Sequence, residues 1–240
     1  MENQTTLILT TSYVPTHPDT SIIEKSINSL KNTFVKTIIT YDAAREKNDD
    51  YDEYIKKMVE KYPLFIHLIQ ETNLGFRNSL KSALDIVETP FVVVLQHDVE
   101  ICGALPFKSI EKLPLSQWNI ISTNHLEKGL NKPTHWYPII NDAGPLMKKT
   151  FGWCERIFIA KTEFLKNKCL NATTKAFLET QFFSQFKTLY KKLEKIKSYK
   201  QIPKISIHQQ TYDDYWDGWR CYTLKSDVCY HRHLCGRTST

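Results

Sequence analysis

The feature that most constrains the fold is the alternation of strand-like and helix-like segments over the first 95 residues. Apolar runs of strand length lie at residues 5–12, 35–41, 64–69 and 91–95. The last run, Phe91-Val-Val-Val-Leu95, has no polar residue, which is typical of a strand buried on both faces of a sheet. Strands and helices in this order predict an α/β fold whose central sheet is mainly parallel and flanked by helices.

Helix signals separate these strands. Ser21-Ile-Ile-Glu24 has the capping-box pattern, so we expect a helix to begin there and to run to about Lys31. Two more helices are expected at about 52–61 and 76–87, and Thr89-Pro90 ends the second of them.

The alternation is less regular after Glu100. The segments expected there are strands at 118–123 and 156–160, a long irregular stretch at 124–153 and an amphipathic helix at 174–197. No internal repeat or linker divides the chain, so we expect a single domain over residues 1–240.

Composition excludes several classes of protein. The 240 residues are 41% hydrophobic and 24% charged, which is unlike a disordered, collagen-like or disulfide-scaffold chain. No apolar run approaches the roughly 20 residues that a transmembrane helix needs. The first residues lack a basic signal-peptide region, so we expect a cytoplasmic protein whose six cysteines are reduced. The net charge of +6 is compatible with phosphate-bearing ligands or an anionic surface.

Polar residues follow each of the first four strands, where an open α/β sheet binds its ligands. These strand ends are Thr10–Tyr13, Tyr41-Asp42, Gln70-Glu71 and Gln96–Glu100. Asp98 is the sharpest case, because a carboxylate after a wholly apolar strand needs water, a cation or a hydrogen-bond donor. A plain turn-capping role for Asp98 is the alternative interpretation.

The sequence lacks the common phosphate-binding and hydrolase motifs. It has no G-x-G-x-x-G after the first strand, no G-x-x-x-x-G-K-[ST] and no G-x-S-x-G. A nucleotide diphosphate bound without a glycine-rich loop requires a divalent cation to neutralise it. One carboxylate at a strand end suits that role.

Four segments together resemble a known family. They are Leu7-Ile-Leu-Thr-Thr-Ser-Tyr-Val-Pro15, Asp42, Asn73-Leu-Gly-Phe-Arg-Asn78 and Val94-Leu-Gln-His-Asp98. The first hundred residues resemble the nucleotide-sugar-binding half of GT-A fold glycosyltransferases, especially the family-2-like ones, with Val94–Asp98 in the place of the Asp-x-Asp motif. Some glycosyltransferases of large DNA viruses are also similar, which would imply a host cytoplasm. The resemblance implies a nucleotide-sugar-binding half at 1–100 and an acceptor-binding half at 101–240.

The resemblance implies a nucleotide-sugar site made of Thr11, Ser12, Tyr13, Asp42, Arg77, Gln96, His97 and Asp98. In it the Thr11–Tyr13 tip and Asp42 hold the nucleoside, with Asp42 near the base edge, and Arg77 approaches the base or the diphosphate. Gln96 stands near the ribose, where the family has its first Asp, so the site has one negative charge fewer. Asp98 stands in the metal-binding position, and the implied cofactor is Mn²⁺ or Mg²⁺. Glu100 is a weaker candidate ligand.

The resemblance also implies an acceptor site. Glu179 is the candidate catalytic base, with Asp142 and Glu155 as rivals, and a helix-dipole role for Glu179 is the alternative. Trp153 and Glu155 would line the acceptor sugar, although Trp153 also fits a core position.

The tail Cys229-Tyr-His-Arg-His-Leu-Cys235 resembles a zinc site, but its outer cysteines would lie about 20 Å apart on an extended strand. A site made of two of these four Cys and His residues together with Asp98 is more reasonable, and the resemblance implies that a late histidine serves the metal. We prefer His231 over His233. Packed, hydrogen-bonded histidines are the alternative.

The predicted function is a metal-dependent glycosyltransferase of glycan biosynthesis. It would move a sugar from a UDP- or GDP-sugar to a hydroxyl of a glycan or glycoconjugate, and the sugar class and stereochemistry stay open. The alternatives are a nucleotidyltransferase with a related sheet and a non-catalytic nucleotide-sugar or glycan-binding module. No nucleic-acid-binding module is recognisable. The lysine-rich run Lys187–Lys200 suits either a peripheral membrane contact or a solvated helix face.

Overall fold

The computed structural model describes residues 1–13, 19–46, 48–126, 139–143, 145–150, 154–170, 220–225 and 228–234. The helix expected at 174–197 and the Lys187–Lys200 run lie outside these residues. Among the described residues, no helix is both long enough and apolar enough to cross a membrane.

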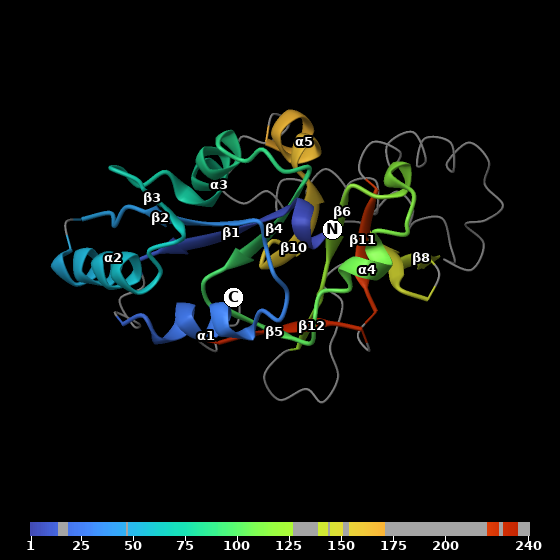
Figure 1. The fold of residues 1–240 in the computed structure, drawn as a ribbon, viewed down its shortest axis with the longest axis horizontal. Helices are drawn as coiled ribbons and strands as arrows, with labels where there is room; N and C mark the ends of the chain where they lie inside the picture. Colours follow the sequence, from blue (N-terminus) through green and yellow to red (C-terminus); the bar gives the residue numbers. More distant parts are fainter. Residues whose placement is uncertain are drawn as a thin grey trace, which may run out of the picture.

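The main sheet has nine strands within the described residues (Figure 1). Its parallel half consists of β3 (Ile66–Ile69), β2 (Lys36–Asp42), β1 (Thr5–Ser12) and β4 (Phe91–Gln96), in that order. The order continues with β10 (Ile157–Lys161), β6 (Ile120–Ser122), β11 (Cys221–Leu224), β9 (Met147–Thr150) and β8 (Ile139–Ala143). β10 is antiparallel to both of its neighbours. The prediction of an α/β fold with a central sheet flanked by helices is confirmed. We expected a mainly parallel sheet, and within the described residues it has four parallel and four antiparallel pairings, with the parallel ones concentrated in the first four strands.

Helices cover both faces of this sheet (Figure 1). One face carries α1 (Ser21–Ser29), α2 (Asp49–Lys61) and α4 (Phe107–Ile110), and the other carries α3 (Gly75–Asp85), α5 (Thr162–Phe164) and the π-helix η3 (Leu165–Cys169). Two short 3-10 turns, η1 (Glu2–Gln4) and η2 (Leu115–Gln117), complete the helical elements of the described chain.

Strand β4 shows why the sheet is buried on both faces. Val93 and Leu95 point into the core on the α2 side, whereas Val92 and Val94 point into the core on the α3 side. All four side chains are fully buried, and each contributes about 1.5–3 kcal/mol of hydrophobic stabilisation. The strand therefore fixes the centre of the fold and presents its polar end, Gln96 to Asp98, at one edge.

A second sheet is built on that edge. It has three strands in the order β5 (Val99–Cys102), β12 (Tyr230–His233) and β7 (Asn124–Leu126). The chain passes from β4 into β5 through a tight turn at residues 97–98, so the turn joins the two sheets.

The expectation of an irregular segment at 124–153 is wrong, because β7, β8 and β9 all lie within it. These strands are three to five residues long. Two of them, β7 and β9, pair with β12 and β11 from the end of the chain. These strands are stabilised by partner strands that lie far away in the sequence, so local sequence patterns do not predict them.

Candidate functional site

The polar ends of β1, β2 and β4 meet at one edge of the main sheet. In the parallel register, Ser12 lies opposite Asp42, and Thr10 lies opposite Gln96. Because parallel strands end at the same edge, side chains from separate parts of the sequence gather there. This edge therefore holds most of the residues that the sequence predicted for a nucleotide site.

Asp98 and His233 form a contact across the turn between the two sheets. The His233 Nε2 atom lies 2.8 Å from the Asp98 Oδ2 atom, and the Leu234 N–H donates to the Asp98 carbonyl oxygen at 2.8 Å. Both side chains keep some exposure, 16% for Asp98 and 11% for His233. A carboxylate and an imidazole in a partly open position can together bind a cation. The bound cation can in turn hold an anionic ligand.

His231 lies on the same face of β12 but in different surroundings. Its ring is fully buried, with Nδ1 at 2.6 Å from the Thr123 Oγ1 atom and Nε2 at 3.8 Å from the Cys154 Sγ atom. The register explains the difference, because His233 lies opposite Val99, next to Asp98, and His231 lies opposite Ile101. The structure thus brings His233 to Asp98, whereas the sequence interpretation preferred His231.

The second sheet offers no larger metal cluster in the part of the chain that the structure describes. No group of three or more His, Cys, Asp or Glu side chains there is arranged to hold an ion. Arg232, on the opposite face of β12, pairs with Glu100, so Glu100 is engaged by a cation of the protein itself. Cys229 is a buried thiol, and burial raises its pKa to about 12.

Asp42 has a structural task that sequence reasoning missed. Its carboxylate accepts hydrogen bonds from the Leu74 N–H at 2.6 Å and from the Gly75 N–H at 2.9 Å. These amides begin α3, where backbone N–H groups lack intrahelical partners. Gly75 has a φ of 71°, which favours glycine over residues with a side chain. The Asn73-Leu-Gly75 turn in the sequence indicated where the helix begins. It did not indicate that Asp42 caps this helix.

A group of tyrosines packs beside the ends of β1 and β2. The ring centroids of Tyr13 and Tyr51 are 5.6 Å apart, and Tyr51 stacks on Tyr54 at the same distance. The Tyr54 hydroxyl lies 3.4 Å from the Thr11 Oγ1 atom. Thr11 is buried and Ser12 exposed, so the β1 tip presents the Ser12 side chain and part of the Tyr13 ring to ligands.

Arg77 lies in the first turn of α3. Its guanidinium donates to the Asn78 side-chain oxygen and to the Leu170 carbonyl oxygen, which follows η3. The Arg77 side chain therefore links α3 to η3. Gln96 and His97 are held by their backbones: the Gln96 N–H donates to the Arg156 carbonyl oxygen and the His97 N–H to that of Thr10, at 2.9 and 3.0 Å.

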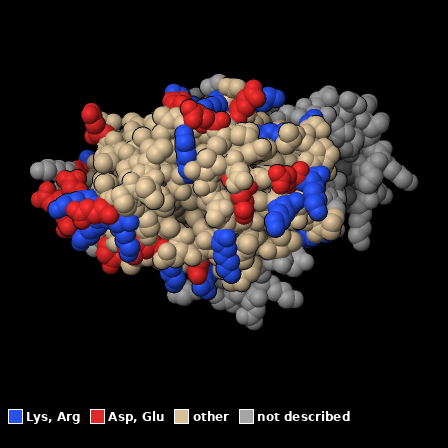
Figure 2. Space-filling view, viewed as in Figure 1, with Lys and Arg blue, Asp and Glu red and all other residues tan. Residues whose placement is uncertain are grey.

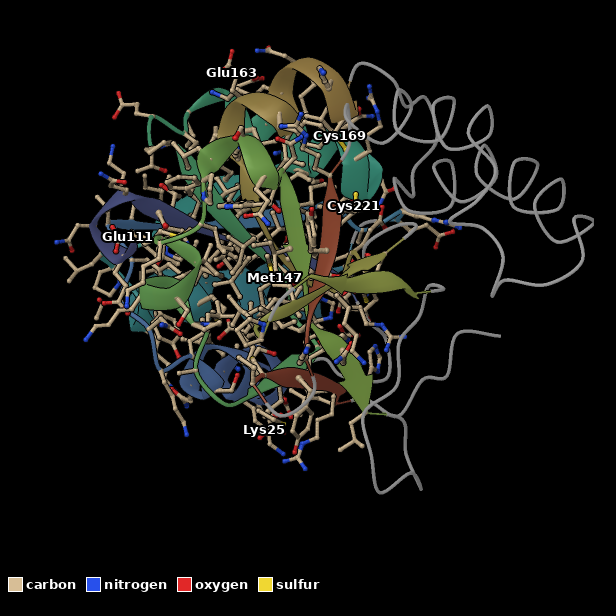
Figure 3. The ribbon with its side chains drawn as sticks, turned by 90° about the vertical axis from the view of Figure 1, so that its right-hand side faces the viewer. Lys25, Glu111, Met147, Glu163, Cys169 and Cys221 are labelled. Carbon is tan, nitrogen blue, oxygen red and sulfur yellow. The ribbon has the colours of Figure 1, made fainter. Side chains whose placement is uncertain are left out.

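Of the predicted acceptor residues, the structure describes only Glu155 with its side chain. Glu155 is almost fully buried just before β10, and its charge is one of the causes that raise the pKa of the Cys169 thiol. Burial is the largest of these causes, and Cys221 on β11 is another; Figure 3 labels both cysteines. Trp153, Glu179 and the Asp142 side chain lie outside the described part of the chain.

Charge is unevenly distributed over the face drawn in Figure 2. Acidic and basic side chains gather at the end of the molecule formed by α2, and much of the face beside it is uncharged. The first turn of α2 carries Asp49, Asp50 and Asp52, which suit the positive end of the helix dipole. The acidic residues of this cluster are therefore explained by their favourable interaction with the helix dipole.

The chain is similar to two solved structures and to one curated protein. No protein-family profile matches the chain. The structure of S. aureus TarS superposes with a TM-score of 0.53 at 14% identity, covering 96% of this chain and 36% of that one. TarS 1–349 in complex with UDP superposes equally well, covering 95% of this chain and 60% of that one. The fold is the GT-A fold.

In this chain the fold places Asp98 in the turn that follows β4 and Asp42 at the end of β2. The chain spans only 36% and 60% of the lengths of the two TarS chains that it matches. A curated relative, UPF0521 protein B of Dictyostelium discoideum, is 28% identical over 79 residues, which are 33% of this chain and 85% of that protein.

Proposed function

We propose that this protein is a glycosyltransferase that moves a sugar from a UDP- or GDP-sugar to an acceptor hydroxyl. The observation that carries the proposal is the contact between Asp98 and His233 at the carboxyl end of β4, in a sheet with GT-A topology. TarS, which shares the fold, has been crystallised with UDP. Residues 1–100 would form the nucleotide-sugar half, and residues 101–240 the acceptor half.

The Asp98 and His233 side chains fit a divalent cation such as Mn²⁺ or Mg²⁺. The carboxylate is a preferred ligand of these ions, and an imidazole nitrogen 2.8 Å away can complete a two-residue donor set. Two protein donors leave the other positions for diphosphate oxygens and water. A bound cation would neutralise the charge that develops on the departing diphosphate.

The other residues would bind and orient the substrates. Tyr13 offers part of an aromatic face to the base, and the Gln96 amide can hydrogen-bond a ribose hydroxyl. Arg77 adds positive charge on the α3 side, with its guanidinium held by Leu170 and Asn78. Ser12 and His97 complete the rim.

On the acceptor side, Glu179 would take the proton from the acceptor hydroxyl in an inverting reaction, holding it on the carboxylate as the hydroxyl oxygen attacks. Trp153 would pack against the acceptor sugar. Glu155 is too buried to meet the acceptor unless its neighbours move, so its contribution is to shape the wall of the site.

Nucleotide-sugar hydrolysis tests this proposal. The purified protein is incubated with a panel of UDP- and GDP-sugars in the presence of Mn²⁺, and released nucleotide is measured before and after a chelator is added. We expect release with at least one donor, and its loss on chelation. Binding without release would favour the non-catalytic module, and release of pyrophosphate from a nucleoside triphosphate and a sugar phosphate would favour the nucleotidyltransferase.

A further inference from the structure

Helix α1 lies beside β5, the edge strand of the second sheet, and polar side chains join the two segments (Figure 1). The Ser29 Oγ atom accepts the Ile101 N–H at 2.9 Å. Just after the helix, the Asn32 side chain accepts the Leu105 N–H at 2.8 Å and donates to the Leu105 carbonyl oxygen at 3.0 Å. Within the described residues no further strand pairs with this side of β5, so side chains from the α1 region hold it instead.

Ser26 makes the first of these contacts, at the turn between β4 and β5. Its hydroxyl donates to the His97 carbonyl oxygen at 2.6 Å, and the residue is fully buried. A serine in the middle of a helix usually faces solvent or bonds a carbonyl one turn back. Ser26 instead bonds a carbonyl 71 positions along the chain, so its hydroxyl holds the turn rather than the helix.

The His97 carbonyl belongs to the peptide unit that leads into Asp98. Because a peptide unit is planar, fixing this carbonyl also fixes the N–H and the Cα atom of Asp98. On the other side of the residue, the Leu234 N–H donates to the Asp98 carbonyl oxygen at 2.8 Å. The His97 N–H donates to the Thr10 carbonyl oxygen at 3.0 Å. Of these three hydrogen bonds that hold the turn, only the one from Ser26 comes from a side chain, so a substitution can remove it without altering the proposed metal ligands.

We propose that Ser26 is a positioning residue for the divalent cation, because its hydroxyl fixes the direction in which the Asp98 carboxylate points. A ligand on a loose turn must be ordered when the ion binds, and the entropy lost in ordering it weakens binding. A turn that Ser26 already holds loses less entropy. This inference rests on the proposed function, because it takes Asp98 to be a metal ligand.

Manganese titration in the presence of UDP or GDP, with free Mn²⁺ measured by EPR, tests it on the wild type, Ser26→Ala and Ser26→Cys. Ser26→Ala should weaken Mn²⁺ binding about threefold to tenfold, because one hydrogen bond that orients the carboxylate is lost. Ser26→Cys keeps a weak S–H donor, so its Mn²⁺ affinity should lie between those of the wild type and Ser26→Ala.

Ser29→Ala is the matched control. It removes a hydroxyl from the same helix, but one that holds the Ile101 N–H and not the turn before Asp98. Both alanine variants should lower the melting temperature by about 2–4 °C, whereas Mn²⁺ affinity in Ser29→Ala should stay within about twofold of the wild type.

Unchanged Mn²⁺ affinity in Ser26→Ala, or in Ser26→Cys if the alanine variant does not fold, would overturn the role of Ser26 and leave the proposed function standing. Equal losses of affinity in Ser26→Ala and Ser29→Ala would do the same, since they would reflect a general loosening of β5. Failure of the wild type to bind Mn²⁺ with either nucleotide would overturn both the role of Ser26 and the proposed metal site.

Discussion

Two regions at the same edge of the sheet are built in opposite ways. The proposed nucleoside tip, made of Tyr13, Asp42 and the Tyr51 ring that packs on Tyr13, is mostly buried and comes from one continuous stretch of about forty residues. The proposed metal corner, made of Asp98 and His233, is partly exposed and joins residues more than a hundred positions apart. The tip is held by the packing of α2 and by the hydrogen bonds from the start of α3 to Asp42, whereas the corner depends on β12 pairing with β5. A substitution of Asp42 should therefore mainly affect stability, and one at the corner should mainly affect activity.

The largest effect is expected from Asp98→Ala. Removing the one carboxylate of the metal corner should lower metal-dependent turnover by about a thousandfold, because the leaving diphosphate loses its neutralising cation. The free energy of unfolding should fall by no more than about 2 kcal/mol, since one side-chain contact to His233 is lost and the Leu234 N–H still donates to the backbone carbonyl of residue 98. Turnover and urea unfolding measure the two effects. Asp85→Ala, an exposed acid on α3, is the control and should change neither. Turnover within tenfold of the wild type would remove Asp98 from the mechanism.

Asp42→Ala should show the opposite pattern to Asp98→Ala, with the free energy of unfolding affected more than turnover. Two amides at the start of α3 lose a charged acceptor, so we expect the free energy of unfolding to fall by about 2–4 kcal/mol. Asp42→Asn keeps one acceptor oxygen and should lose about half as much. Urea unfolding of the two variants tests this. If Asp42→Ala were as stable as the wild type, the hydrogen bonds between Asp42 and the start of α3 would not be what holds the nucleoside tip.

The nucleoside tip could largely be predicted from the sequence, whereas the pairing of Asp98 with His233 could not. The strands and helices up to Leu95 follow from local periodicity and turn residues, so most of the nucleoside tip was predicted. His231 and His233 have the same periodicity, and only the register of β12 against β5 distinguishes them. That register is a contact between two strands more than a hundred residues apart in the sequence, and no local pattern encodes it. Asp42 was predicted as a ligand contact, and its cap on α3 was missed because it too spans more than thirty residues.

The two histidines of β12 lie on one face of the same strand, but only His233 contacts Asp98. His233→Ala should weaken Mn²⁺ binding about tenfold with little change in stability, because it removes one donor at the corner. His231→Ala should lower the free energy of unfolding by about 1–3 kcal/mol, since it removes a buried bond to Thr123, with little change in Mn²⁺ affinity. Manganese titration in the presence of UDP or GDP, together with urea unfolding, separates the two variants. A greater loss of metal affinity in His231→Ala than in His233→Ala would restore His231 as the metal residue.

The smallest effect is expected at Glu100, which lies beside the corner but pairs with Arg232. The hydrogen bond from Arg232 lowers the pKa of Glu100 below 4.5, so the pair adds stability above that pH and loses it as the pH falls through the lowered value. The Arg232 side chain is half exposed, so solvent screening should limit the effect of Glu100→Gln at neutral pH to less than about 1 kcal/mol. Urea midpoints of the wild type and Glu100→Gln should differ slightly at neutral pH and converge well below pH 4.5. A large loss of turnover in Glu100→Gln would instead make Glu100 part of the metal corner.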